Sequence, residues 1–410
     1  HRANGQQRDK PLQVRQSKQT VCLAHKRGLA TSIFAPPAPP TVSTRPKTAT
    51  MSGLFGSAAS SNSNPTQGDL SKDVPVANPP EDSISALRFS PASDHLSVAS
   101  WDKKVRIYEI DAQGQGKGVA MFEHEGPVLD TCWSNDGQKV FAVGADKAAR
   151  MLDLGAGQTS GGTQVAAHDQ PIKCVKAFNA GGTPMLVTGS WDKTIKYWDL
   201  RQQQPAATLD AKERVYAMDI RNDSMLVVGT AERQIHVINL SNPTAFFKTM
   251  QSPLKWQTRT VSTFIDGSGF AVGSIEGRCA IQYVDEKDSS SNFSFKCHRQ
   301  TPPDNRNISN VYAVNAISFH PQHGTFSTAG SDGTFHFWDK DAKHRLKGYP
   351  EVGGTISATE FNRSGNIFAY AVSYDWSKGY QFNTPQTPNK IMLHPVVGDE
   401  CKPRPKTTKR

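Results

Sequence analysis

Long apolar runs, paired cysteines and catalytic motifs are all missing from this sequence. No stretch approaches about 18 consecutive apolar residues, so we expect neither a transmembrane helix nor membrane insertion. The six cysteines form no CxxC pair, and four of them stand among apolar residues, as reduced core cysteines of an intracellular protein do. A disulfide framework and a zinc site are therefore not expected. There is also no phosphate-binding glycine loop and no isolated catalytic dyad, so we predict no enzyme, no metal and no cofactor.

Positive charge is in excess, but it is concentrated at the two ends of the chain. The net charge is +10. Residues 1–50 carry nine Lys and Arg against the single acid Asp9, and residues 399–410 carry five against Asp399 and Glu400. The body between them is nearly neutral, so the high isoelectric point does not indicate a nucleic-acid-binding core. The basic ends can attract polyanions or can simply be solvated.

The composition predicts one folded body between two disordered tails. We expect residues 1–71 to be a basic, low-complexity tail, residues 72–396 to be folded, and residues 397–410 to be a basic tail. Residues 1–50 are rich in Arg and poor in acids, as in a mitochondrial transit peptide. The alternative, which we favour, is that they are not native and that Met51 is the native start, because a Ser-, Gly- and Asn-rich segment begins there.

One unit of sequence recurs along the folded part. Residues 185–199 show it most clearly, with an apolar strand, a tight turn that carries Asp192, and an alternating strand that ends in Trp198 and Asp199. Equivalent turn acids follow at intervals of 40–56 residues, close to the length of a four-stranded propeller blade. These acids are Asp102, Asp146, Asp192, Glu232, Glu276, Asp332 and Asp375. Seven copies predict an all-β fold, a seven-bladed WD-repeat β-propeller.

An alternating strand precedes each turn acid and gives the inner strand of each predicted blade. These strands are residues 84–89, 128–133, 172–177, 215–220, 260–265, 314–319 and 356–361. The one interval of 56 residues predicts an insertion at residues 285–311. The last blade has further strands at 367–372 and 390–394 but lacks a fourth. We predict that Asp73–Ala77 supplies it, which closes the ring and removes an open sheet edge.

Two predicted blades carry a histidine ahead of the turn acid. His124 is expected to pair with Asp146, and His168 with Asp192, in a network that Ser190 and Trp198 extend. A set of His, Asp and Ser also suggests a hydrolase. Because the set recurs from blade to blade and lacks a nucleophile elbow, we interpret these residues as structural networks.

A further set of residues combines aromatic rings with cations. Lys340, Lys343, Arg345 and Lys347 form a basic run just after Trp338. Another stretch alternates aromatic and basic residues: Phe293, Phe295, Lys296, His298 and Arg299. Aromatic faces that stack on bases, beside cations that bind phosphates, predict a platform for single-stranded nucleic acid. In the alternative interpretation, Trp338 is an ordinary blade-terminal residue that packs inward, and the lysines are surface charges.

Several stretches closely resemble the WD-repeat messenger RNA export factor family of the nuclear pore. They are residues 189–199, 273–278, 292–299, 312–321, 337–342 and 374–379. The resemblance covers residues 72–405, is weaker through 202–260 and excludes 1–50. The related spindle-checkpoint WD-repeat family, which binds similar segments of checkpoint kinases, shares 273–278 and 312–321, whereas 374–379 is similar to the export factors alone.

The resemblance implies an adaptor that binds a hairpin-like nucleoporin segment, the GLEBS motif, and supports messenger RNA export. It implies a location in the nucleus and at the nuclear envelope and pore, with some cytoplasmic pool, and a mitotic spindle role in some members. The alternative function is a protein-interaction scaffold without RNA binding, either of the spindle-checkpoint type or a ubiquitin-ligase substrate receptor. A Gly-Leu-Phe-Gly tetrapeptide at residues 53–56 resembles pore repeats, or is part of an ordinary tail.

The resemblance also implies two binding regions. A groove on the side of the propeller binds nucleic acid in the family. Lys343 stands where family members have Arg. Lys supplies the same charge, but it lacks the planar, bidentate hydrogen-bonding group of Arg. With the neighbouring cations, the candidate RNA-binding residues are Arg278, Phe295, Lys296, Trp338, Lys340, Lys343 and Arg345. For the nucleoporin segment, Trp101, Trp191 and Trp376 stand in loops beside turn acids, either as exposed anchors or as packing residues.

Overall fold

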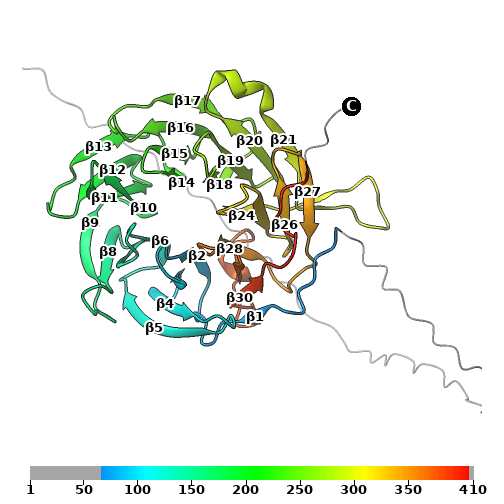
Figure 1. Ribbon diagram of the computed structural model, residues 1–410, viewed down its shortest axis with the longest axis horizontal. Coiled ribbons are helices and arrows are strands. Elements are labelled where there is room, and N and C mark those ends of the chain that lie inside the picture. Colours follow the sequence, from blue (N-terminus) through cyan, green and yellow to red (C-terminus); the bar gives the residue numbers. More distant parts are fainter. Residues whose placement is uncertain (1–65, 406–410) are drawn as a thin grey trace, which may run out of the picture. The chain divides into compact units, whose positions relative to one another are not determined.

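The computed structural model describes residues 66–405 and confirms the seven-bladed propeller. Seven four-stranded antiparallel sheets stand in a ring (Figure 1), and residues of their inner strands line a central channel. Residues 1–65 and 406–410, with Met51 and the Gly-Leu-Phe-Gly tetrapeptide, lie outside the described residues. In the described part, no helix is long and apolar enough to cross a membrane.

Each blade runs from an inner strand at the channel to an outer strand at the rim. The blades in chain order are β2 (Ile84–Phe89), β3 (His95–Ser100), β4 (Lys104–Ile110) and β5 (Gly116–Glu123); β6 (Val128–Trp133), β7 (Lys139–Gly144), β8 (Ala148–Asp153) and β9 (Thr163–Ala167); β10 (Ile172–Ala180), β11 (Thr183–Ser190), β12 (Thr194–Asp199) and β13 (Ala207–Asp210); β14 (Val215–Arg221), β15 (Met225–Thr230), β16 (Gln234–Asn239) and β17 (Lys248–Gln251); β18 (Thr258–Thr263), β19 (Gly269–Ser274), β20 (Arg278–Tyr283) and β21 (Phe293–Lys296); β24 (Val314–Phe319), β25 (Phe326–Gly330), β26 (Phe335–Asp339) and β27 (His344–Gly348); and β28 (Ile356–Phe361), β29 (Ile367–Val372), β30 (Lys390–Pro395) and β1 (Val74–Pro75). Four short elements complete the fold: η1 (Glu286–Ser291), β22 (Arg299–Gln300), β23 (Asn310–Val311) and η2 (Tyr380–Phe382).

The hydrophobic core is divided into clusters that each join two neighbouring blades. Val187 of β11 and Leu226 of β15, for example, belong to one cluster between the third and fourth blades. Because both faces of a middle strand are covered by neighbouring blades, such a strand is buried along its length, as every residue of β15 is. The outer strands alternate instead, because one of their faces meets solvent.

Ring closure follows the prediction. β1 pairs with β30, with Val74 opposite Leu393 and Pro75 opposite Met392. Asp73, just before β1, lies 2.6 Å from Nδ1 of His394 and accepts a 2.6 Å hydrogen bond from the Tyr370 hydroxyl. The side chains of Asp73 and His394 are each 2% exposed, so the two ends of the ring are joined by a buried ion pair as well as by the strand.

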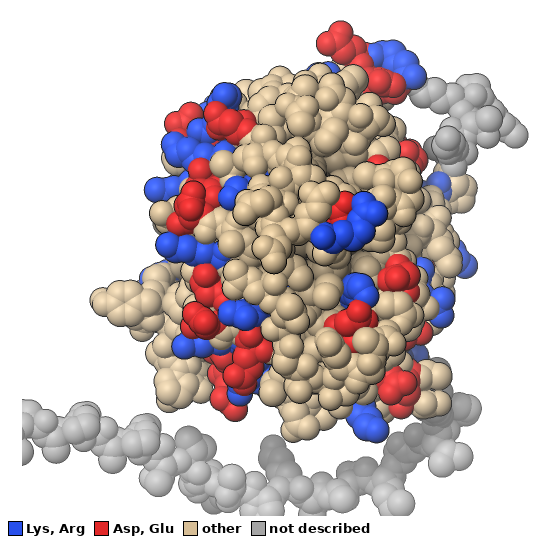
Figure 2. All heavy atoms as spheres, turned by 90° about the vertical axis from the view of Figure 1, so that its left-hand side faces the viewer, with Lys and Arg blue, Asp and Glu red and all other residues tan. Residues whose placement is uncertain are grey.

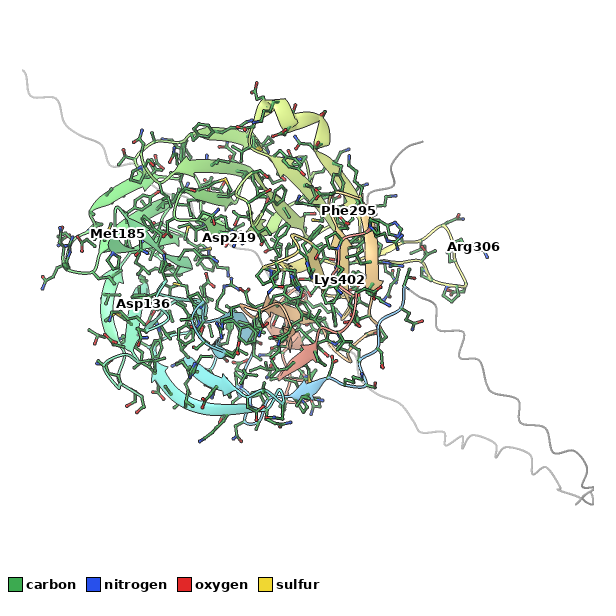
Figure 3. The ribbon with its side chains drawn as sticks, viewed as in Figure 1. Asp136, Met185, Asp219, Phe295, Arg306 and Lys402 are labelled. Carbon is green, nitrogen blue, oxygen red and sulfur yellow. The ribbon has the colours of Figure 1, made fainter. Side chains whose placement is uncertain are left out.

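The predicted insertion at residues 285–311 is corrected. Its middle is β21, the regular outer strand of the fifth blade. The additional chain forms η1 before it and the β22–β23 hairpin after it, and that hairpin projects from the ring near Arg306 (Figure 3). The inner strand of the same blade also begins two residues earlier than predicted, at Thr258.

The ordered chain continues beyond both expected boundaries of the folded part. Before residue 72, Gly68 donates a backbone hydrogen bond of 2.9 Å to Gly348 at the end of β27. After residue 396, Cys401 is buried against the sixth and seventh blades. Within residues 66–405 the five cysteines are free and buried, and no group of His, Cys, Asp or Glu has a metal-binding arrangement.

Candidate functional site

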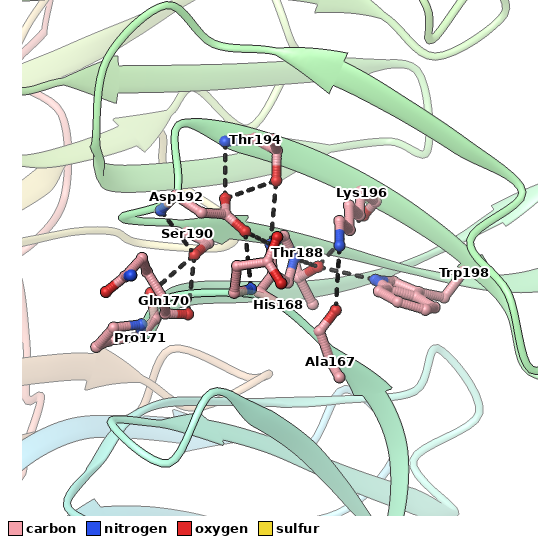
Figure 4. A network of polar contacts seen from close by, with 11 residues as sticks. Ala167, His168, Gln170, Pro171, Thr188, Ser190, Asp192, Thr194, Lys196 and Trp198 are labelled. Carbon is pink, nitrogen blue, oxygen red and sulfur yellow. Dashed lines mark hydrogen bonds and ion pairs between the residues drawn. The ribbon is translucent and has the colours of Figure 1, made fainter. Parts of the chain in front are cut away.

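The histidine networks form as predicted. His124 Nδ1 lies 3.0 Å from Asp146, and His168 Nδ1 lies 2.8 Å from Asp192 (Figure 4). Thr188, which the sequence analysis missed, joins His168 to the blade-terminal tryptophan: its hydroxyl is 2.7 Å from His168 Nε2 and accepts a 2.8 Å bond from the Trp198 indole. Ser190 extends the network as predicted, because its hydroxyl accepts the backbone N–H of Asp192 at 3.1 Å and donates to the Pro171 carbonyl at 3.0 Å.

The electrostatics of this network suit a structural role. Burial lowers the pKa of His168, although hydrogen bonding to Asp192 acts in the opposite direction. Burial alone would raise the pKa of Asp192, but hydrogen bonds from His168 and Thr194 hold it well below its usual range. The arrangement recurs in the sixth blade, where His298 lies 2.8 Å from Asp332. A set repeated in three blades is explained by the geometry that the blades share.

Replacement of His168 by alanine is expected to lower the melting temperature and to leave ligand binding by the folded protein unchanged. The substitution removes the hydrogen bonds that His168 makes with Asp192 and Thr188 in a buried site, at a cost of about 1–3 kcal/mol. Thermal unfolding followed by circular dichroism checks the prediction. A selective loss of binding with an unchanged melting temperature would contradict it.

A bulge at the start of every inner strand builds the candidate site at one end of the channel. In all seven blades the pairing of the inner strand with its neighbour shifts after the first residue, as between Ile84 and Ala86. A bulge re-aims the extra residue. The extra residues all line one pocket and are Ser85, Leu129, Lys173, Tyr216, Arg259, Asn315 and Ser357. We call this pocket, of about 330 Å³, the channel mouth.

All three tryptophans predicted as peptide anchors line the channel mouth. Trp101 and Trp376 stack with ring centroids 4.0 Å apart, although they are far apart in sequence. Trp191 is 38% exposed. The turn that follows each blade acid places the next residue at positive φ, which is 61° at Trp376 and 70° at Lys103.

More aromatic residues near the mouth are exposed, and the sequence analysis missed them. Trp256 is 59% exposed and directly precedes Gln257, which lines the mouth. Tyr380 and Phe382, in η2 of the loop that carries Trp376, are 76% and 57% exposed. Large exposed aromatic side chains gathered around a pocket are typical of a protein-interaction surface.

Two cations at the mouth have only neutral partners. The Arg259 guanidinium donates to the Asp375 carbonyl at 2.8 Å and to the Asn315 side chain at 3.1 Å. Lys173 donates to the Leu129 carbonyl at 3.4 Å. Within residues 66–405, no ion pair joins Lys173 or Arg259 to a carboxylate. Lys173 and Arg259 outnumber the one carboxylate that lines the mouth, Asp375, so the mouth offers positive charge to an incoming acidic group.

Deeper in the channel the charges compensate one another. Arg88 lies 3.5 Å from Asp130 and 3.4 Å from Glu360, and Lys176 lies 3.0 Å from Asp219, which faces the channel (Figure 3). Burial alone would raise the pKa of Asp219, but Lys176 and neighbouring donors lower it to about 2. On the outside, charged side chains gather toward the two rims of the wall beside β9 and β13 and leave the band between them mostly uncharged (Figure 2).

The second candidate site lies between the fifth and sixth blades. Lys296, Arg299, His336, Trp338 and Arg345 line a pocket of about 540 Å³, which we call the side groove. At its edge Phe295 packs on Trp338, with ring centroids 4.5 Å apart. Trp338 also donates its indole N–H to Thr328 at 2.9 Å, so it is both a blade-terminal residue and part of the groove wall.

The other predicted groove residues differ in how they are placed. Lys343 is exposed and lies over the Phe293 ring at 4.9 Å. Arg278 is opposite Lys296 in the sheet and lies 3.8 Å from Glu276. Lys340, by contrast, is only 10% exposed, bonds to Asp341 at 2.8 Å and lies over Phe264. Its ammonium therefore points away from the groove.

Comparisons with known proteins agree with the propeller fold. The family described as "WD domain, G-beta repeat" matches residues 75–109, 162–199 and 307–339. The chain is 66% identical to "mRNA export factor GLE2" of Chaetomium thermophilum over 364 residues, which cover 88% of this chain and 100% of that protein. It is 61% identical to "Poly(A)+ RNA export protein" of Schizosaccharomyces pombe, over 86% of this chain and 99% of that protein. It is 45% identical to "Protein Rae1" of Drosophila melanogaster, over 86% and 99%.

Proposed function

This chain belongs to the WD-repeat mRNA export factor family, and on that premise we propose that it is a nuclear-pore adaptor in mRNA export. It binds a nucleoporin segment of the GLEBS type at the channel mouth and single-stranded RNA in the side groove. Its place is the nucleus and the nuclear pore, with a cytoplasmic pool, and mitotic spindle proteins are further partners.

One observation carries the peptide-binding proposal. Seven bulge residues and three tryptophans from distant parts of the sequence meet at one pocket, which also holds two cations without carboxylate partners. Such a pocket suits an extended segment that has an apolar side chain for the stacked rings of Trp101 and Trp376 and acidic side chains for Lys173 and Arg259. The segment must cross the end of the propeller to reach both.

The RNA-binding proposal rests on the side groove. Trp338 and Phe295 supply aromatic faces, and stacking contributes about 1–3 kcal/mol per base. Lys296 and Arg345 are exposed cations that line the same groove. Alternating aromatic and basic groups bind single strands with little sequence preference and with strong salt dependence.

Replacement of both Lys296 and Arg345 by glutamate is expected to weaken RNA binding and its salt dependence. Loss of two phosphate contacts lowers the slope of log affinity against log salt by about 1.4. Fluorescence anisotropy with a labelled oligouridylate at several salt concentrations measures the slope. Replacement of Lys340 by glutamine is the control, because its ammonium is paired with Asp341 and the slope is expected to stay constant. Equal slopes in the unaltered protein, the double variant and the Lys340 variant would mean that the side groove does not bind RNA.

A further inference from the structure

The β22–β23 hairpin gives the side groove a second wall. We infer that this hairpin, residues 299–311, binds single-stranded RNA together with the groove and carries the RNA path outward from the ring. The inference rests on the proposed RNA-binding function of the groove. It deepens that function, because the preferred ligand becomes a single strand long enough to contact both the groove and the hairpin.

The base of the hairpin is fixed on the fifth blade. The Arg299 guanidinium donates to the carbonyls of Glu276 at 2.7 Å and of Gly277 at 3.3 Å. Gly277 has a φ of 62°, and a Cβ at this position would lie only 2.8 Å from the His298 carbonyl oxygen and 3.1 Å from that of Tyr312. Glycine therefore lets the chain pack closely under the hairpin. These contacts set the direction in which the hairpin leaves the ring.

Side chains of the hairpin line the groove with hydrogen-bonding groups. Gln300, Thr301 and Ser309 are exposed and line the same pocket as Trp338 of the sixth blade. The Gln300 side-chain oxygen accepts a 3.2 Å bond from the Tyr312 hydroxyl, so its amide N–H groups remain to donate. Within residues 66–405, the hydroxyls of Thr301 and Ser309 have no hydrogen-bond partner. A strand that stacks on Trp338 can therefore bond to the hairpin through base edges and ribose hydroxyls.

The tip of the hairpin reaches beyond the groove. It is shaped by turns in which Asn305 donates to the Pro302 carbonyl at 3.3 Å and Ile308 donates to the Asn305 carbonyl at 3.2 Å. Figure 3 shows Arg306 at the far end of the hairpin, outside the ring. Arg306 is exposed, and in the described part of the chain no ion pair joins it to Asp304 or to another acid. Because Ile308 is 50% exposed, the tip offers a cation for a phosphate and an apolar side chain for a base.

The inference is tested with a variant of the full chain in which a two-residue Asn-Gly turn joins Gln300 directly to Asn310. These two residues face each other in the hairpin, so the short turn keeps β22 and β23 and removes the tip. A four-residue oligouridylate fits the groove, whereas a 12-residue oligouridylate also reaches the tip. The ratio of the two affinities, measured by fluorescence anisotropy, is expected to fall about tenfold in the variant, the effect of roughly one bound base.

A point variant tests the tip without a change in chain length. Replacement of Arg306 by glutamate is expected to lower the slope of log affinity against log salt for the 12-residue strand by about 0.7, because one phosphate contact is lost. Replacement of Lys117 by glutamate is the matched control. Lys117 is an exposed cation of β5 that does not line the side groove, so the slope is expected to stay constant.

The outcomes separate the hairpin from the groove. If the shortened variant keeps the affinity ratio of the unaltered chain, the groove keeps its function and the inference is overturned. Equal slopes in the Arg306 and Lys117 variants would also overturn it, and this comparison decides alone if the shortened variant does not fold. A shortened variant that loses affinity only for a nucleoporin peptide would assign the hairpin to a protein partner and overturn the inference. Absence of RNA binding by the unaltered chain would overturn the inference and the RNA part of the proposed function together.

Discussion

Replacement of Asp73 by alanine is expected to lower the free energy of unfolding by about 3–5 kcal/mol, because it removes the nearer of the two carboxylates that bind the buried His394. Asp73 lies 2.6 Å from His394 and accepts a hydrogen bond from Tyr370 at the seam where β1 closes the ring. For a folded part of this size, the loss corresponds to a melting temperature lower by about 6 °C. Differential scanning calorimetry measures it. Replacement of Asp69, an exposed acid in the same segment that bonds only to Ser71, is the control and is expected to have no such effect.

The same seam predicts a loss of stability in alkaline solution. Burial alone would lower the pKa of His394, but Asp73 and Glu400 raise it from 6.5 to about 9. A histidine whose pKa is raised by folding stabilises the protein fully below the unfolded pKa and loses this contribution as the pH rises through the folded pKa. We therefore expect about 3 kcal/mol of stability to disappear between pH 6.5 and 9. If the free energy of unfolding of the Asp73 variant falls as steeply between pH 6.5 and 9 as that of the unaltered protein, the ion pair of Asp73 with His394 is not the cause of the loss.

Replacement of both Lys173 and Arg259 by glutamine is expected to weaken binding of an acidic nucleoporin segment by about 100-fold. Each cation is expected to form one charge-assisted hydrogen bond with a carboxylate of the segment, and loss of each contributes about 1.5 kcal/mol or more. The substitutions remove the charge and keep a shorter, polar side chain at each position. Isothermal titration calorimetry of the folded variant measures the change in affinity.

Controls for this prediction use the same loss of charge elsewhere. Replacement of Lys117 and Arg363, exposed cations that do not line the channel mouth, is expected to change the affinity by less than about twofold, because surface charges far from an interface are screened. Thermal unfolding of all variants verifies that they are folded. If both double variants bind the segment equally well, the channel mouth is not where the acidic groups bind.

The repeat made most of the fold predictable from sequence. Turn acids at regular intervals, alternating strands and histidines ahead of the turns are local patterns, so the blades and the pairs His124–Asp146 and His168–Asp192 followed from them. The ring closure by β1 also followed, because the last blade lacked a strand and one extended segment was free. The insertion was misassigned, because a regular outer strand lies between two short additions to the chain.

The channel mouth was only partly predictable. Its ring takes one residue from each blade, and these residues share a backbone bulge but no side-chain type, from Leu129 to Lys173 to Tyr216. A sequence pattern that compares side-chain types does not detect such a set. Alignment of the inner strands, followed by selection of the second residue of each, would have identified it. The orientation of Lys340 could not be predicted from the sequence either, because its ammonium contacts Asp341 and the Phe264 ring and not the groove.

The most direct test of the account is a calorimetric titration of the full chain with two peptides, a nucleoporin GLEBS segment and its counterpart from a spindle-checkpoint kinase. The account predicts at least about tenfold preference for the nucleoporin segment, which is about 1.4 kcal/mol, and loss of most of that affinity when Lys173 and Arg259 are replaced. Preference for the kinase segment, or binding that the substitutions leave unchanged, would contradict it.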